Sequence, residues 1–369
     1  MKLPQIQRRI SRQIRVGDVA IGGGAPISIQ SMTTTPTADV DATVAQIRAL
    51  AEAGADIVRV AAATAADTAV LKDIVSASPV PVVADVHFHF QRAMEAVAAG
   101  VHKLRLNPGT LSDRCQVREV IAACKQAGIP IRVGVNEGSV VERLDGPRRA
   151  EQLAGPLVEL MLEALARYLE VFAEAGFDDL VLSAKSCDAT ACVAVNRALA
   201  DRYDYPLHLG LTHAGTASTG VIRSTAALGT LLAEGIGDTI RMSLTGDPRE
   251  EVAAAKELLW ALRLRQREGV EIIACPTCGR TTADVAALAD QLQAATADVP
   301  EHVVAAVMGC VVNGPGEAAE ADVAACCGKG KAAIFVHGRR VETVPEAKIV
   351  PTLTRHIQAL AKEKANRTG

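Results

Sequence analysis

Eight short runs rich in β-branched residues recur along the first two thirds of this 369-residue chain, separated by longer alanine-rich segments with helical periodicity. Strands that alternate with amphipathic helices are typical of βαβ units and a parallel sheet. The runs are residues 26–32, 56–62, 80–88, 102–107, 129–136, 179–185, 205–213 and 237–244. Eight such units in succession predict a (β/α)8 TIM barrel.

The segments between these runs end in a regular way. Helical patterns cover residues 39–53, 90–99, 111–127, 150–175, 187–201 and 218–234. Glycines that can end a helix in the left-handed conformation follow five of them, at Gly54, Gly100, Gly128, Gly176 and Gly235. The pattern of a glycine between small residues followed by an apolar strand therefore recurs along the chain. It forms a weak internal repeat, with one βα unit per copy. A doubly wound open sheet is the competing architecture, because strand counts from a single sequence can be wrong.

The chain changes character near residue 268. A helical segment at 248–264 leads into the polar stretch 265–269, and the remainder of the chain contains a Cys-x-x-Cys motif, a Gly-Pro-Asn loop and a short strand at 333–338. A charged helix from about residue 350 ends the chain. We therefore expect a substrate-binding barrel over 1–268 and a smaller α+β domain over 269–369.

Composition excludes several classes of partner. The net charge is −3 and aromatic residues make up 2% of the chain, which argues against binding to nucleic acid by charge or by base stacking. Nine cysteines and an N-terminus without an apolar core argue against a secreted disulfide framework. The apolar stretch 303–312 is too short to span a bilayer. These features predict a protein of the reducing cytoplasm without a nucleic-acid or membrane partner.

Cations lie inside the predicted strands, where both faces should be buried. Five strands carry one in or near the C-terminal half: Arg59, Arg105, Arg132, Lys185 and Arg241. An uncompensated buried guanidinium costs several kcal/mol, so five cations at one barrel mouth indicate a polyanionic ligand among them. The alternative is that some of them pair with Asp56, Asp85 or Asp179 inside the barrel.

The loops after the seventh and eighth runs favour a phosphate or diphosphate ligand. Residues 214–220 lead into a helix, Ser243 lies at the end of the eighth run, and the loops after these two runs form the usual phosphate site of TIM barrels. Strand ends are also where barrel enzymes place catalytic groups, and here they carry Asp85, His87, Asn136 and His213. For His87 and His213, catalytic and structural roles remain open.

Other histidines and a glycine run are interpreted as structural. His89, His102 and His208 have no such catalytic context in the sequence. The run from Gly22 to Gly24 is expected to form a hairpin turn in an N-terminal β-segment, since no strand and helix surround it as in a nucleotide-binding loop.

The second domain carries a candidate metal site. Cys275 and Cys278 are spaced so that one loop can bind a metal, and Cys310 follows 32 positions later. This pattern suits zinc or an iron–sulfur cluster, and the spacing alone does not choose. Glu317 offers a carboxylate as fourth ligand, as in a cluster with one exchangeable iron. The adjacent Cys326 and Cys327 are poor joint ligands of one ion, although one of them could still supply a ligand. Four more cysteines are expected to be small buried hydrophobes: Cys115, Cys124, Cys187 and Cys192.

Nine segments together are distinctive: QSMTTTPTADVDATVAQI, GADIVRV, ADVHF, LRLNPG, IRVGVNEGS, HLGLTHAG, EGIGDTIRMSL, ACPTCGR and GCVVNGPGEA. They resemble the 4-hydroxy-3-methylbut-2-enyl diphosphate synthase family, the iron–sulfur enzymes of the methylerythritol phosphate route to isoprenoids. The resemblance runs from about residue 28 to 345 and is to the shorter, two-domain bacterial form.

The resemblance implies a reaction, a cofactor and a set of ligands. The reaction is reductive ring opening and dehydration of 2-C-methyl-D-erythritol 2,4-cyclodiphosphate, by two one-electron transfers through a [4Fe-4S] cluster. The implied cluster ligands are Cys275, Cys278, Cys310 and Glu317. The implied phosphate ligands are Arg59, Arg105, Arg132, Asn136, Lys185 and Ser243, with Asp85 and His87 nearby. The family also implies a head-to-tail homodimer with a site shared between chains, and flavodoxin or ferredoxin as electron donor.

Two positions depart from the family pattern. Thr212-His213-Ala214-Gly215 stands where the family usually has Thr-Glu-Ala-Gly, so His213 would replace an acidic residue, and His89 stands where many relatives have aspartate. The proton that turns the departing hydroxyl into water is expected from His213, Asp85 or His87. Two rival hypotheses are a zinc-containing barrel transferase for a pterin-like ligand and a non-catalytic binding module with a metal-stapled interface.

Overall fold

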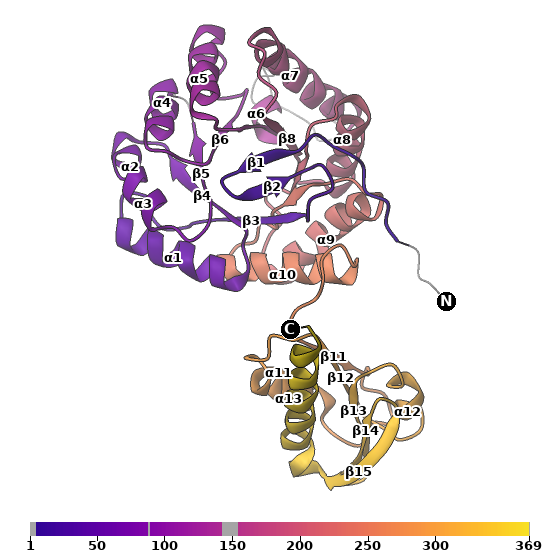
Figure 1. Cartoon of the computed structure of the whole chain (residues 1–369). Helices are drawn as coiled ribbons and strands as arrows, with labels where there is room; N and C mark the ends of the chain where they lie inside the picture. The colour runs from indigo at the N-terminus through magenta and orange to yellow at the C-terminus, as the bar shows by residue number, and fades with distance from the viewer. Residues whose placement is uncertain (1–4, 88, 142–153, 369) are drawn as a thin grey trace. The chain divides into compact units, whose positions relative to one another are not determined.

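The computed structural model describes residues 5–87, 89–141 and 154–368. Its internal contacts divide the chain into two compact units, Met1–Arg265 and Gln266–Gly369. Each unit has its own sheet and its own hydrophobic core (Figure 1).

The first unit contains the predicted barrel. Its strands are β3 (Ser28–Met32), β4 (Ile57–Ala62), β5 (Val82–Val86), β6 (Lys103–Leu106), β7 (Ile131–Asn136), β8 (Leu180–Lys185), β9 (His208–Leu209) and β10 (Thr239–Ile240). They pair in parallel in the order β8-β7-β6-β5-β4-β3-β10-β9. A further bridge joins Leu182 of β8 to Leu207 beside β9, so the two ends of the sheet also meet. The prediction of a TIM barrel is confirmed and the open-sheet alternative is wrong.

Helices surround the strands in Figure 1. They are α1 (Val40–Ala53), α2 (Ala65–Ala69), α3 (Leu71–Ala77), α4 (Phe90–Ala98), α5 (Arg114–Ala127), α6 (Glu137–Val141), α7 (Ala154–Glu174), α8 (Ala189–Arg202), α9 (Ala217–Ala233) and α10 (Pro248–Ala261). Local sequence explains their ends. Asp39 caps α1 by accepting from the Ala42 N–H, and Gly54 ends that helix at φ 106°. Gly128 ends α5 in the same way at φ 66°.

A hairpin closes the amino end of the barrel. Strands β1 (Ile14–Val16) and β2 (Val19–Ile21) are antiparallel, with Val16 paired to Val19 across a two-residue turn. Their buried side chains pack on Ile57, Val83 and Val181, which lie near the amino ends of β4, β5 and β8. The predicted N-terminal hairpin is therefore present, but its turn is Gly17-Asp18. The glycines from Gly22 to Gly24 follow β2 instead.

The second unit is a mixed sheet with helices. Its strands, in sheet order, are β11 (Val270–Ala274), β12 (Val303–Met308), β13 (Val323–Gly328), β14 (Lys331–Val336) and β15 (Arg339–Pro345). The first three are parallel, and the pairs after β13 are antiparallel. Two longer helices, α11 (Val285–Ala295) and α13 (Ile349–Thr368), share one apolar core with the sheet, and residues beside the short α12 (Gly314–Glu317) belong to a second one. The predicted final helix is confirmed.

Among the described residues, none of the helices is both long and apolar enough to cross a bilayer.

Candidate anion site and thiolate site

The carboxyl ends of the barrel strands bring the predicted cations together. Register pairs join Asp85 with Arg105, Arg105 with Arg132, and Asn136 with Lys185. Four cations are nearly inaccessible to solvent: Arg59, Arg105, Arg132 and Lys185 are 8%, 4%, 1% and 5% exposed. The charges of Arg59, Arg105 and Arg132 all act on Lys185, so these side chains form a single positively charged layer inside the barrel. Arg132 is nevertheless the second residue of β7, whereas Lys185 is the last residue of β8.

Asp85 is the acid of this layer. Its carboxylate accepts from Arg105 Nη1 at 3.0 Å, lies 3.5 Å from Arg59 Nη1, and lies 3.3 Å from His87 Nε2. Burial alone would raise the pKa of Asp85, but the guanidinium groups of Arg59 and Arg105 outweigh it and hold the pKa well below its usual value. The expected alternative of pairing inside the barrel is thus correct for Asp85. Asp56 instead accepts from Arg265.

Arg241 has an acidic partner that sequence reasoning missed. Its Nε and Nη2 donate to the two carboxylate oxygens of Glu251 on α10, each at 3.1 Å. Glu251 is 3% exposed and also accepts from Ser31 Oγ and the Leu244 N–H. The sequence does not indicate that Glu251 is buried, because a glutamate in the first turn of a helix is usually exposed to solvent.

Arg132 and Lys185 have no acidic partner in the described part of the chain. Arg132 donates from Nη1 to Ser183 Oγ at 2.8 Å, while its Nε and Nη2 are buried without an acceptor there. Two glycines leave room for these side chains. A Cβ on Gly134 would lie 2.7 Å from Ser183 Oγ, and one on Gly210 would lie 2.7 Å from Lys185 Nζ. Unpartnered buried donors lining such a space fit a ligand rich in acceptor oxygens.

Two more buried titratable side chains lie inside the barrel. Lys103 on β6 and His208 on β9 are both 0% exposed, and their nitrogen atoms have no hydrogen-bond partner among the described residues. Burial, followed by the charge of Arg132, holds the pKa of Lys103 well below its usual value. Lys103 is the first residue of β6, whereas the sequence predicts functional cations towards the carboxyl ends of the strands. His102, by contrast, accepts from the Val82 N–H through Nδ1 at 3.0 Å, as expected of a structural histidine.

The loops after β9 and β10 lie side by side. The Thr245 N–H donates to the Gly215 carbonyl, and Thr216 and Thr245 form a parallel bridge. The first turn of α9 receives no side-chain cap from Thr216, so its N–H groups are open to a ligand. His213 is exposed in this loop at φ 54°, a left-handed conformation that is uncommon for a residue with a side chain. Ser243 lies in the second loop, two residues after Arg241.

A carboxylate also links the ends of β7 and β8. Glu137 Oε2 accepts from Ser186 Oγ at 2.6 Å, from the Cys187 N–H at 3.2 Å and from Cys187 Sγ at 3.4 Å. Asn136 and Lys185 are the adjacent residues on these strands, so the contact fixes the spacing of two predicted phosphate ligands.

The second unit brings two of the predicted thiol ligands to one edge of its sheet. Cys275 follows β11 and Cys310 lies just beyond β12, and these strands are parallel neighbours. The Gly309 N–H donates to Cys275 Sγ at 3.1 Å. Backbone N–H groups of Asn313 and Val312 lower the pKa of Cys310. Backbone donors of this kind stabilise thiolates and the sulfurs of metal clusters.

Cys278 and Glu317 complete the predicted set. Cys278 is exposed, with its N–H bound to Thr281 Oγ1, and Glu317 is the exposed last residue of α12. No group of three or more His, Cys, Asp or Glu side chains in the described ranges is gathered closely enough to hold one metal ion. A cubane cluster binds each ligand at a different iron, so it accepts ligands that do not converge on one point.

The interpretation of the remaining cysteines was partly wrong. Cys124 and Cys192 are buried, as predicted, but Cys115 and Cys187 are exposed. Cys115 lies in the first turn of α5, whose buried residues start at Val117, so it stands on the outer face. Cys326 and Cys327 are buried on opposite faces of β13.

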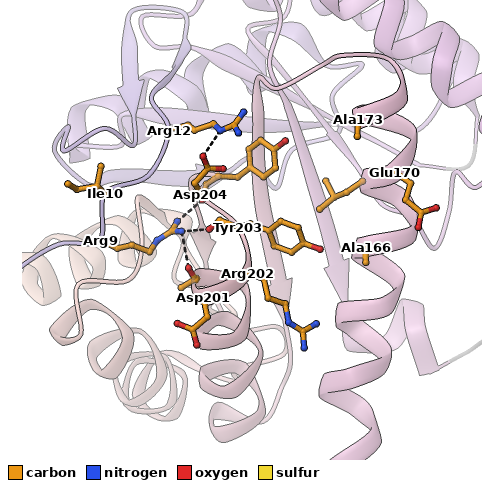
Figure 2. Close-up of a pocket in the computed structure, with 13 residues that line it drawn as sticks. Arg9, Ile10, Arg12, Ala166, Glu170, Ala173, Asp201, Arg202, Tyr203 and Asp204 are labelled. Atoms are coloured by element: carbon orange, nitrogen blue, oxygen red, sulfur yellow. Dashed lines mark hydrogen bonds and ion pairs between the residues drawn. The ribbon is translucent and has the colours of Figure 1, made fainter.

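A groove outside both sites is lined by paired charges (Figure 2). Its volume is about 780 Å³, between the N-terminal segment, α7 and the end of α8. Arg9 donates to the carbonyls of Tyr203 and Tyr205, and Arg12 donates to Asp204. These contacts tie the Nη atoms of Arg9 and the Nε of Arg12 to acceptors of the protein itself, while Arg9 Nε is buried without a partner among the described residues.

Taken together, the described residues define a TIM-barrel protein with a group of buried cations inside the barrel and a separate unit that carries the Cys-x-x-Cys motif. Family models match both parts: the GcpE TIM-barrel domain over residues 11–256 and the GcpE protein C-terminal domain over residues 271–359. The chain belongs to the GcpE family, whose members here are 4-hydroxy-3-methylbut-2-en-1-yl diphosphate synthases.

Curated relatives support this assignment over nearly the whole chain. Proteins named 4-hydroxy-3-methylbut-2-en-1-yl diphosphate synthase (flavodoxin) from Geobacter sulfurreducens and Aquifex aeolicus are each 45% identical, covering 96% and 97% of this chain and 99% of each relative. The one from Salinispora tropica is 48% identical, covering 98% of this chain and 91% of the relative. The expected resemblance to this family is confirmed.

Proposed function

We propose that this chain reductively opens the ring of 2-C-methyl-D-erythritol 2,4-cyclodiphosphate and removes water, giving 4-hydroxy-3-methylbut-2-enyl diphosphate. Membership of the synthase family supports the reaction. The observation that carries the substrate class is the barrel layer of Arg59, Arg105, Arg132 and Lys185, which holds more cations than the described acids neutralise. A compact diphosphate supplies the missing negative charge.

We assign the diphosphate to the mouth of the barrel. Arg132 offers two unsatisfied buried N–H groups, and Lys185 offers an amine without an acidic partner among the described residues. Asn136 and Ser243 add neutral polar groups beside them. Fixed cations of this kind hold the substrate and stabilise the negative charge that develops on the phosphate as it leaves the ring carbon.

Asp85 and the histidines take different roles in this proposal. A pKa far below its usual value keeps Asp85 ionised at neutral pH, so Asp85 holds the guanidinium groups of Arg59 and Arg105 in place and does not donate a proton. The proton for the departing hydroxyl then comes from His87 or His213. His87 contacts Asp85 and Arg105, whereas His213 stands exposed in the β9–α9 loop.

The second unit fits a [4Fe-4S] cluster. Cys275, Cys278 and Cys310 would bind three irons and Glu317 the fourth, and the N–H donors at Cys275 and Cys310 suit cluster-bound sulfur. Such a cluster supplies single electrons and a Lewis-acidic iron for the substrate oxygen. In this proposal the unit Met1–Arg265 binds the substrate and the unit Gln266–Gly369 holds the cluster, with the boundary three residues before the predicted one at 268. We further propose cytoplasmic location, a homodimer with a shared site, and flavodoxin as electron donor, the last from the names of the relatives.

The test of this function is anaerobic purification followed by visible and electron paramagnetic resonance spectra, with dithionite and the cyclodiphosphate. We expect a brown protein that turns over the cyclodiphosphate. A colourless protein with stoichiometric zinc, which iron and sulfide cannot reconstitute, would instead support a zinc-containing barrel transferase.

A variant separates catalysis from simple binding. Arg105→Ala should abolish measurable turnover while leaving the cluster spectrum unchanged, because Arg105 lies in the barrel and not in the thiolate unit. Unchanged turnover in Arg105→Ala would favour a non-catalytic binding module.

Glu317→Ala tests the proposed fourth cluster ligand. This variant should lose turnover even when its cluster is intact, and full activity would show that Glu317 takes no part in the mechanism.

A further inference from the structure

The charges inside the barrel do not balance, even before its lysines are counted. Four guanidinium groups face two carboxylates there: Arg59, Arg105, Arg132 and Arg241 against Asp85 and Glu251. Guanidinium groups stay protonated in proteins. Two positive charges are therefore uncompensated by the described acids, and any further cation in the same space is repelled.

Lys185 stands in that space. It ends β8, is 5% exposed, and forms no ion pair with a described acid. Its Nζ occupies room left by Gly210, at 2.7 Å from where a Cβ would stand. Burial, and then the charges of Arg132, Arg59, Arg241 and Arg105, hold the pKa of Lys185 well below its usual value.

The groups around Lys185 come from all neighbouring elements. The charges of Arg59 on β4, Arg105 on β6, Arg132 on β7 and Arg241 after β10 act on Lys185, and the charge of Lys185 acts on His208 of β9. Among the acids that contact these arginines, Asp85 at the end of β5 is held by Arg59 and Arg105. Glu137 is committed to Ser186 and Cys187, and Glu251 to Arg241. None of the described acids therefore compensates a charge on Lys185.

We propose that Lys185 is a neutral amine in the ligand-free barrel and becomes an ammonium when the diphosphate enters, taking its proton from solvent. A cyclic diphosphate carries one strongly acidic oxygen on each phosphorus, hence two negative charges at neutral pH. Burial and the arginine charges together keep Lys185 neutral in the empty barrel. The two ligand charges cancel the surplus of the arginines, and the phosphate oxygens offer the ammonium the acceptors that burial withholds. The ammonium then adds a positive charge beside the phosphate that leaves in the proposed reaction.

This inference rests on the proposed function, because it needs a diphosphate in the barrel mouth. The test is isothermal titration calorimetry of the cluster-loaded, oxidised enzyme with the cyclodiphosphate, without reductant so that no turnover occurs. The cyclodiphosphate has no group that titrates near neutral pH. The dependence of the binding heat on the ionisation enthalpy of the buffer therefore counts the protons taken up by the protein.

We expect an uptake of about one proton per site at pH 7.5 in the unmodified enzyme, as linkage requires for a group that is neutral before binding and charged after it. Lys185→Arg should bind with an uptake close to zero, because its side chain is already charged. Lys72→Arg is the matched control on the exposed face of α3 and should keep the full uptake. Circular dichroism checks the folding of each variant.

The outcomes separate this inference from the function on which it rests. Binding without proton uptake in the unmodified enzyme would overturn the inference and leave the proposed function intact. Uptake that persists in Lys185→Arg, or in Lys185→Gln where the arginine does not fit beside Gly210, would assign the proton to Lys103 or His208 and also overturn it. Absence of any binding to the cluster-loaded enzyme would count against the proposed function itself.

Discussion

Arg241 and Glu251 form a two-pronged ion pair inside the barrel, with both nitrogen–oxygen distances at 3.1 Å. The pair links the segment after β10 to the first turn of α10, and its side chains are only 16% and 4% exposed. One of the five predicted cations is thereby neutralised by the protein itself. Arg241 thus lies among the predicted phosphate-binding cations, but most of its charge is neutralised by Glu251.

Removal of Glu251 should destabilise the barrel. Glu251→Ala leaves the Arg241 guanidinium buried without its partner, and breaking such a pair costs about 3–5 kcal/mol. Urea unfolding followed by circular dichroism should show a clear fall in the midpoint of the barrel transition. Glu250→Ala is the matched control, because Glu250 is the exposed neighbour on the same helix and forms no ion pair with a described residue. Equal midpoints for the two variants would contradict a structural role for Glu251.

Asp85 should make the stability of the barrel pH-dependent. Its folded-state pKa is depressed, so its contribution is present above the unfolded-state pKa of about 3.9 and is lost as pH falls through the folded-state value. Asp85→Asn should therefore be less stable than the unmodified enzyme at pH 7 and pH 5, and the gap should shrink below about pH 4. Urea midpoints of both proteins at each pH test this. A gap that stays constant down to pH 3 would mean that Asp85 does not titrate as described.

Gly134 should be needed for substrate affinity. A Cβ at this position would lie 2.7 Å from Ser183 Oγ and 3.3 Å from Arg132 Nη1, so Gly134→Ala displaces the hydroxyl that orients Arg132. We expect KM for the cyclodiphosphate to rise about tenfold, the equivalent of one lost hydrogen bond to a charged group. Gly138→Ala is the control, since a Cβ there meets no atom within 4 Å. A similar KM in both variants would mean that the contact of Arg132 with Ser183 is not needed for substrate affinity.

The cysteines should divide into ligands and packing residues. Single serine replacements of Cys275, Cys278 and Cys310 should each lower the bound iron and sulfide and abolish the cluster spectrum. Cys115→Ser should retain both, because Cys115 lies exposed on α5 in the other unit. Iron and sulfide analysis after anaerobic reconstitution provides the measurement. A full cluster in any of the three ligand variants would assign that position to another residue.

Much of the barrel could be predicted from local sequence. All eight predicted strands are present, because β-branched runs and the glycines after helices are local signals that tertiary packing here reinforces. The strands β9 and β10 are only two residues long, although the patterns predicted 205–213 and 237–244. Their flanking residues belong to the loops that form the mouth.

The candidate site could be predicted only in part, because some of its contacts join residues far apart in the sequence. Strand-end cations can be recognised in the sequence, because a charge in a buried run needs an explanation. Their acidic partners cannot, since Glu251 reaches Arg241 from a helix. The further buried cation Lys103 is the first residue of β6, so it lies away from the strand ends where functional groups are expected. Cys115 and Cys187 were assigned to the interior on residue type alone, and only the orientation of each element shows that they are exposed.

Local sequence is enough to predict the order of strands and helices, the cations within the strands and the thiol spacing, since each depends on residues close together in the chain. The tertiary structure decided which of these charges are paired. Arg241 meets Glu251 and Asp85 meets two arginines, whereas Arg132 and Lys185 are buried without an ion pair to a described acid. Pairing depends on side chains that approach across the closed barrel, and no local pattern encodes that distance.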